Sequence, residues 1–343
     1  MQCKFVPTKK LFIFACLLLS FSATQTIATP NFWLKVPGKY KSVKAYSKDL
    51  YDLVQELVTK GSDDDLSGEF QVISRLLRKG ANPASLIKRE SEELDTVLHI
   101  AAESKKTQIL KVILENTPEI ESKINVKDEN DMTPLHAALW IHDARRGMEE
   151  SEKIQWRKEN VKLLLAFGAD PNLQERFGHS SLMLAVCCNW PLDIIELLIE
   201  KKADPDTQTT NGYAPLHYLM HHNGKDYQTA KVLLEAGGAN PKIEDNEGYA
   251  PIHFAVRYKA YPTIKLLLRH NAEPLQRNKQ DETPLSQLGF EAESYSSPYV
   301  SRADECRSQG FNEKELSALY EITRMLFPSH AQWLLKNDGN EEF

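Results

Sequence analysis

The chain lacks the motifs that mark most enzymes and nucleotide-binding proteins. It contains no nucleophile elbow, no P-loop, no Rossmann glycine fingerprint and no H-E-x-x-H metal-binding motif. It also lacks an excess of positive charge, because 42 Lys and Arg residues face 48 Asp and Glu residues and the formal net charge is −6. Proteins bind a phosphate backbone mainly through Lys and Arg, so this balance argues against a nucleic-acid partner. We therefore expect neither catalysis nor a cofactor.

The N-terminus has the three-part pattern of a secretory signal peptide. Basic residues precede an apolar run, Leu11–Leu19, and small residues follow it. The run is shorter than the roughly 20 residues that a membrane-spanning helix needs. We therefore expect a signal peptide over residues 1–28, cleaved within residues 22–29, with an uncleaved membrane anchor and lipidation of Cys16 as alternatives. The prediction is an exported protein, periplasmic or secreted, whose membrane contact is confined to this segment.

Cysteine is scarce, and glycosylation acceptors are missing. Of five cysteines, two lie in the predicted signal, which leaves Cys187, Cys188 and Cys306. Three cysteines, two of them adjacent, do not make a disulfide framework. No N-x-Ser/Thr acceptor occurs in the chain. For an exported protein of this size, that absence favours a bacterial source.

One short phrase recurs along the middle of the chain at a nearly fixed spacing. Its fullest form is Thr-Pro-Leu-His, and its copies begin at Thr96, Thr133, Ser180, Ala214, Ala250 and Thr283. The apolar third residue recurs at intervals of 37, 47, 34, 36 and 33 residues. A threonine can cap a helix by accepting a backbone N–H bond, and a proline at the next position suits the first helical turn. The phrase therefore predicts the start of a helix in every unit.

A second pattern closes the units. A Leu-Leu pair is followed by a short segment that ends in Pro, as in Leu164–Pro171 and Leu233–Pro241. Gly or Asn in this segment ends a helix in the left-handed conformation, and Pro prevents its continuation. The same ending at Leu76–Pro83 indicates a degenerate repeat before the first recognisable one. Each unit is thus expected to be a pair of helices.

With its period near 33 residues and its T-P-L-H-x-A phrase, the chain resembles the ankyrin-repeat family over residues 69–290. The resemblance implies an all-α solenoid of stacked helix-turn-helix units with finger hairpin loops and helical N- and C-terminal caps. It also implies function by protein–protein recognition, and structural hydrogen bonds for the motif histidines. The predicted parts are an N-terminal helical cap with a degenerate repeat (31–93), ankyrin repeats at 94–126, 129–173, 176–208, 210–243 and 246–277, and a partial repeat with a helical cap at 279–343.

Three expectations concern segments that depart from the repeat. Ser47 is expected to cap a helix that starts there. The longest interval carries an insertion at 142–159, expected as lengthened helices or a protruding loop. A helix over about residues 312–327 is expected to cover the last repeat.

The candidate binding surface follows from the register of the units. The two variable positions after the alanine pair of each first helix hold Trp140 and Ile141, Cys187 and Cys188, His221 and His222, and Arg257 and Tyr258. Phe177, Tyr213 and Tyr249 are expected at the finger tips, and His179 is expected to be solvated in its finger. Because aromatic residues and Arg are enriched at interface hot spots, we predict a concave groove that binds a protein partner. The predicted partner-binding residues are Trp140, Ile141, Phe177, Tyr213, His221, His222, Tyr249, Arg257 and Tyr258. The alternative is that these side chains pack as part of the scaffold.

Two alternatives to a partner-binding scaffold remain. Cys187, Cys188, His221 and His222 form the ligand set of many tetrahedral zinc sites, and equivalent positions of neighbouring repeats lie side by side. Adjacent residues on a helix point about 100° apart, however, which disfavours convergence of all four side chains. A zinc-binding or hydrolytic site is therefore the less favoured alternative. The other is a structural or helper component of a cell-envelope complex.

Overall fold

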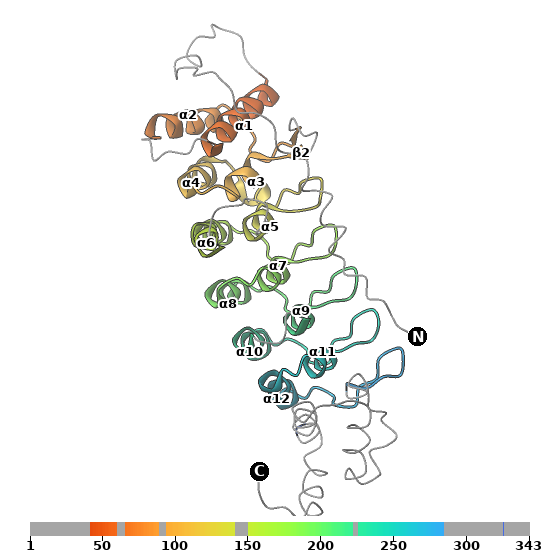
Figure 1. Ribbon diagram of the computed structural model, residues 1–343. Helices are drawn as coiled ribbons and strands as arrows, with labels where there is room; N and C mark the ends of the chain where they lie inside the picture. The colour runs from red at the N-terminus through yellow and green to blue at the C-terminus, as the bar shows by residue number, and fades with distance from the viewer. Residues whose placement is uncertain are drawn as a thin grey trace, which may run out of the picture.

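The computed structural model describes residues 42–59, 66–88, 94–140, 150–221, 226–284 and Met325. For residues 150–155 and 220–221 it describes the backbone alone. These segments form an elongated stack of helix pairs that runs from α1 at one end to α12 at the other (Figure 1).

The stack consists of two rows of helices, with loops projecting beside one row (Figure 1). The inner row, next to these loops, contains α1 (Val43–Thr59), α3 (Val97–Ala102), α5 (Pro134–Leu139), α7 (Ser181–Cys187), α9 (Pro215–His221) and α11 (Pro251–Arg257). The outer row contains α2 (Ser67–Arg78), α4 (Thr107–Asn116), α6 (Glu150–Ala166), α8 (Leu192–Glu200), α10 (Tyr227–Glu235) and α12 (Tyr261–Arg269). A 3₁₀ turn, η3 (Ile120–Ser122), and a short antiparallel pair, β1 (Ile87–Lys88) and β2 (Leu94–Asp95), complete the described elements. The predicted all-α solenoid with finger loops is confirmed.

The inner helices start where the recurring phrase predicts. In α5 the Thr133 side chain accepts the backbone N–H of His136, as a helix cap should. Where alanine replaces threonine, the side-chain cap is lost but the bond to the histidine ring remains, because the Ala214 N–H donates to Nδ1 of His217 at 2.9 Å, as the Thr133 N–H donates to Nδ1 of His136 at 3.1 Å. The other ring nitrogen of His217 donates to the Tyr249 carbonyl of the next unit at 3.0 Å. The motif histidine therefore has the expected structural role and also joins successive units.

The imidazoles of these histidines are shielded from water. His136 and His217 are buried, and burial lowers the pKa of each to about 4. A charged imidazole is poorly tolerated in such surroundings, so both rings are neutral at neutral pH. This links the stability of the stack to pH.

The hydrophobic core runs continuously through the stack between the two rows. Fully buried alanines on the inner helices, such as Ala138 and Ala185, let the rows approach closely, and leucines such as Leu164 and Leu198 fill the space from the outer row. Each unit thus buries its apolar surface against the next, as the additive stability of repeat arrays requires.

Ser47 does not cap α1, and that prediction is wrong. The helix begins at Val43, and the side chain of Ser42 accepts the Ala45 N–H at its start. Ser47 is buried within α1, where its hydroxyl donates to the Val43 carbonyl and accepts the Asn82 N–H, both at 2.9 Å. A serine inside a helix can satisfy its hydroxyl on the preceding turn. Here it also ties α1 to the turn after α2.

The described part of the insertion, which was expected as two lengthened helices or a protruding loop, extends one outer helix. Residues 150–159 are the first turns of α6, whereas 141–149 lie outside the described residues. The predicted signal peptide and C-terminal cap also lie outside them, except that Met325 has helical backbone and packs against the core. Among the described helices, none is both long and apolar enough to cross a membrane.

Candidate protein-binding face

The fingers are tight turns that pack on one another. Glycine with positive φ occupies the turn at Gly178, Gly212 and Gly248. A Cβ added at Gly178 would lie 2.8 Å from the backbone nitrogen of Thr210 in the next finger, so this position requires glycine. The close approach lets each finger bond directly to its neighbour.

A ladder of hydrogen bonds connects successive finger tips. The Thr210 N–H donates to the Phe177 carbonyl at 3.0 Å, the Asn246 N–H to the Asn211 carbonyl at 3.2 Å, and the Lys279 N–H to the Glu247 carbonyl at 2.9 Å. Glutamine side chains add a second set of links at the finger bases. Gln174 donates to the Gly178 carbonyl of its own finger and to the Gln208 carbonyl of the next. We call these two sets of bonds the finger ladder.

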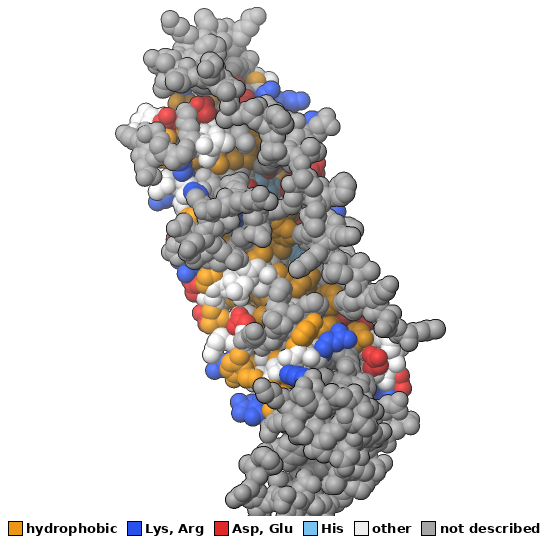
Figure 2. Space-filling view, in the orientation of Figure 1, with side chains coloured by type: hydrophobic (Ala, Val, Ile, Leu, Met, Phe, Trp, Pro, Cys, Tyr) orange, Lys and Arg blue, Asp and Glu red, His pale blue; other side chains and the backbone are white. Residues whose placement is uncertain are grey.

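The inner face is the surface between the inner helices and the fingers. Its described side chains are Trp140, Phe177, His179, Tyr213, Tyr218, Tyr249, Arg257 and Tyr258. Figure 2 looks onto this side and shows hydrophobic side chains over the middle of the inner row, with Lys and Arg side chains at both ends of the stack, including the end that carries α11 and α12. Two cavities lie elsewhere among the described residues, against α2 (about 430 Å³) and between α6 and α8 (about 420 Å³). The inner face carries exposed and half-buried aromatic side chains over several units, which suits a macromolecule better than a small ligand.

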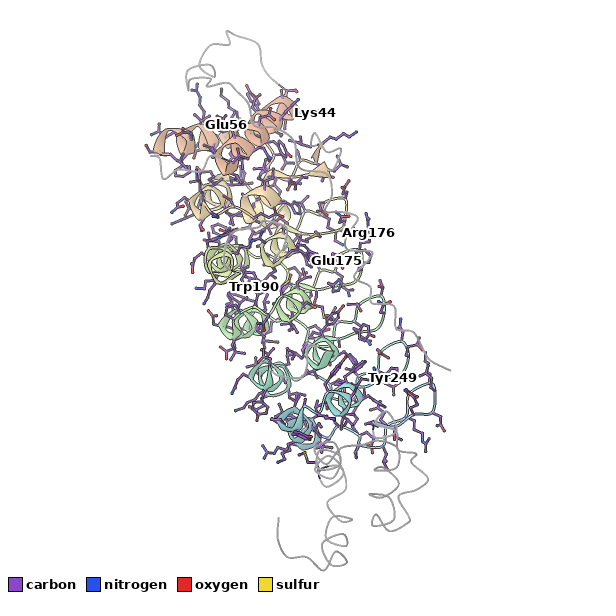
Figure 3. The ribbon with its side chains drawn as sticks, in the orientation of Figure 1. Lys44, Glu56, Glu175, Arg176, Trp190 and Tyr249 are labelled. Carbon is purple, nitrogen blue, oxygen red and sulfur yellow. The ribbon has the colours of Figure 1, made fainter. Side chains whose placement is uncertain are left out.

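Of the three aromatic residues expected at finger tips, Phe177 is there and the other two are not. Phe177 is 55 % exposed. Tyr213 and Tyr249 each follow the turn glycine, whose positive φ directs the chain back toward the inner helices. Tyr249 lies beside α11 at the base of its finger (Figure 3). The expected tip positions of Tyr213 and Tyr249 are therefore wrong.

Both tyrosines belong to an aromatic cluster shared by two units. The Tyr213 ring is 5.7 Å from that of Tyr218 and 6.2 Å from that of Phe254, in edge-to-face arrangements. The Tyr249 ring is 5.6 Å from that of Phe254. Such pairs add stability beyond the area that they bury. Tyr213 and Tyr249 therefore pack as scaffold residues while part of each ring remains on the inner face.

His179 is not solvated, contrary to expectation. Its Nδ1 is 2.7 Å from Oε1 of Glu175, and its Nε2 is 3.2 Å from the hydroxyl of Tyr218 in the next unit. Glu175 is buried at the base of the finger, with Arg176 further out (Figure 3). Burial raises the pKa of the Glu175 carboxyl, but hydrogen bonds from the His179 side chain and backbone and the Phe177 backbone outweigh it and leave the pKa below its ordinary value. The three side chains form one polar network under the inner face.

Trp140 is positioned by an arginine that the sequence analysis did not single out. Trp140 follows α5 and packs half-buried against the core. Arg157 of α6 is 8 % exposed, and its guanidinium donates to the carbonyls of Ala137, Ala138 and Trp140 at the end of α5. A cation at a helix C-terminus satisfies orphan carbonyls and complements the helix dipole. A basic residue within an otherwise buried helix face is the signal that could have identified it.

Arg257 and Tyr258 lie at the end of α11, as the register predicts. Arg257 is exposed, and Tyr258 is half-buried against the core. Burial raises the pKa of both Tyr213 and Tyr249, and the positive charge of Arg257 opposes that rise in each case. Arg257 is therefore close to both tyrosines.

The proposed zinc ligands are described in part. Cys187 and Cys188 are half-buried cysteines at the end of α7. Burial raises the pKa of the Cys187 thiol, with a further contribution from Cys188, and so disfavours the thiolate that zinc binds. The side chains of His221 and His222, like Ile141, lie outside the described residues. Within the described side chains, no group of three His, Cys, Asp or Glu residues could hold a metal ion. The four-ligand site stays a prediction.

Comparisons with known families identify the repeats. Models described as ankyrin repeats in three copies match residues 154–245, and models of ankyrin repeats in many copies match residues 98–146 and 233–286. A single-repeat ankyrin model matches residues 130–176. The chain belongs to the ankyrin-repeat family, whose repeats typically mediate protein–protein interaction without catalysis.

The curated relatives match this chain over part of their length. The chain is 29% identical to the nuclear factor NF-kappa-B p105 subunit of Gallus gallus over 203 residues, 59% of this chain and 18% of p105. It is 26% identical to the E3 ubiquitin-protein ligase KEG of Arabidopsis thaliana over 201 residues, 50% of this chain and 12% of KEG. The ankyrin repeat domain of Bcl-3, described as a unique member of the IkappaB protein family, superposes with a TM-score of 0.51 at 20% identity, covering 66% of this chain and 95% of that domain. The chain thus spans less than a fifth of either curated relative, and the structural match supports the fold alone.

Proposed function

We propose that the protein is an exported, non-catalytic ankyrin-repeat scaffold that binds a protein partner across its inner face and finger tips. The observation that carries the proposal is the inner face itself. There an exposed Phe177, an exposed Arg257 and partly exposed aromatic rings lie along one open side of the stack. Aromatic residues and arginine supply most of the binding energy at protein interfaces. Membership of a family of interaction scaffolds supports the same function.

Site-specific photo-crosslinking tests which face binds. A photoreactive phenylalanine analogue at Phe177 is expected to form a covalent adduct with one protein partner in the native compartment. The control places the same analogue at Lys111, which is 57% exposed on α4 of the outer row. Adducts at Lys111 and none at Phe177 would place binding on the outer row and refute the proposal.

Export requires a separate measurement. The basic and apolar pattern of residues 1–28 supports it, and the intact mass of the native protein in fractionated cells and medium tests it. We expect a mature chain that begins within residues 22–29 and lies outside the cytoplasm. A full-length chain in the cytoplasm or membrane would overturn the export proposal and leave the binding proposal intact.

A further inference from the structure

Two exposed cations lie at the C-terminal end of α11. Arg257 is the final residue of the helix, and Lys259 follows two residues later with a φ of 55°. Tyr258, between them, packs against the core and fixes the turn. Within the described part of the chain, neither Arg257 nor Lys259 forms an ion pair with a carboxylate.

The neighbouring carboxylates are already engaged by their own fingers. Asp245 accepts the N–H groups of Glu247 and Tyr249 at 2.9 and 2.8 Å. Glu282 accepts bonds from the Tyr249 hydroxyl at 3.2 Å and from the Asn278 amide at 2.9 Å. The Glu247 carboxylate accepts a bond from Gln280 at 3.1 Å. The anions therefore stabilise the finger ladder, whereas the two cations face solvent.

An aromatic floor lies next to Arg257. The rings of Tyr213, Tyr249 and Phe254 pack together there, and Arg257 follows Phe254 by about one turn on α11, so the two residues are neighbours on the helix surface. A guanidinium can bind a carboxylate through two parallel hydrogen bonds, and the Tyr213 hydroxyl can donate to the same group, whereas the Tyr249 hydroxyl already donates to Glu282. The exposed parts of the Tyr213 and Tyr249 rings can at the same time contact the apolar part of a peptide.

We propose that this end of the inner face, formed by Arg257 and Lys259 beside the aromatic floor, binds an acidic segment of the partner protein. The inference rests on the proposed function and adds the chemistry of the partner. A peptide with one or two Asp or Glu residues next to an apolar side chain matches both features. A polyanion such as a nucleic acid does not, because Glu247, Asp281 and Glu282 of the adjacent fingers would repel an extended row of phosphates.

Selection from a library of random peptides displayed on phage tests the inference without knowledge of the partner. The full chain is the target, and the selected peptides are synthesised and titrated by fluorescence anisotropy. We expect Asp and Glu to be enriched over the unselected library. Arg257→Gln should weaken binding about ten-fold, as loss of a charge-assisted pair does. Arg257→Lys should retain part of the affinity, because it keeps the charge and loses the two-pronged geometry.

Two further variants make every outcome decisive. Lys265→Gln removes another exposed cation, on α12, and should leave binding unchanged. Phe177→Ser probes the inner face at a distance from Arg257. If Phe177→Ser weakens binding and Arg257→Gln does not, the inner face binds peptides but the acidic preference is refuted. If neither variant weakens binding, the proposed function fails as well.

Discussion

The buried motif histidines make the stack sensitive to acid, and His217 gives the cleanest test. Its side chain is 1% exposed, and burial lowers its pKa from 6.5 to about 4. Between these two values the unfolded chain binds a proton that the folded chain does not. Stability is therefore full above pH 6.5, falls as the pH drops toward 4, and levels off below it.

The expected magnitude follows from the two pKa values. With 6.5 unfolded and about 4 folded, the free energy of unfolding should fall by about 2 kcal/mol between pH 7.5 and 5 on account of His217. His136 has the same folded pKa of about 4 and should contribute a similar amount.

Urea denaturation at the two pH values, followed by circular dichroism, measures the effect. His217→Gln should lower stability at pH 7.5 because it removes the bonds to Ala214 and Tyr249. It should also reduce the difference between the two pH values by about 2 kcal/mol. Ser180→Ala, which removes the hydroxyl cap of α7, is the non-titrating control and should lower stability equally at both. A His217→Gln variant that loses as much stability on acidification as the wild type would refute the reasoning.

Three further variants have defined outcomes. Ser181→Ala should raise the free energy of unfolding by about 1 kcal/mol in urea denaturation, because the Ser181 hydroxyl is buried without a hydrogen bond in the described part of the chain; lower stability would show that the hydroxyl has a partner. Arg157→Met should lower the free energy of unfolding by about 2–3 kcal/mol, and with it the melting temperature, because the carbonyls at the end of α5 lose their hydrogen-bond donor. An unchanged melting temperature would contradict the capping role. Tyr213→Ala should lower the free energy of unfolding by about 3 kcal/mol through lost aromatic packing, whereas Phe177→Ser should change it by about 0.5 kcal/mol or less. Equal effects of the two variants would show that both residues have the same environment.

The architecture could be predicted because it depends on a period. The recurring phrase fixes where inner helices start, and Thr133 and Ser180 cap them as expected. The Gly or Asn endings have the same local basis, since Gly168 and Asn271 have the predicted positive φ. A local signal that recurs in every unit is reinforced with each copy, so substitutions such as Ala214 did not obscure it.

The surroundings of individual side chains could not be predicted, because they depend on residues far away along the chain. His179 is held by Tyr218, 39 residues later, and Tyr213 packs on Phe254. Ser47 is held by Asn82, 35 residues away. The register of the repeats predicts which positions are adjacent. It does not predict whether the side chains at those positions form hydrogen bonds or pack together. Wrong predictions of side-chain surroundings are expected mainly at the bases of the fingers, where a position carries an aromatic or polar side chain.

The finger ladder has a mechanical consequence. Because backbone bonds at the tips and glutamine bonds at the bases both connect each finger to the next, bending one finger strains its neighbours. The tips of successive fingers are therefore held at fixed distances from one another. A partner bound as proposed, with contacts to Phe177 at one finger and to Arg257 two units away, would meet these residues at a fixed separation, and its selection would then depend on the spacing of the contacts as well as on their chemistry.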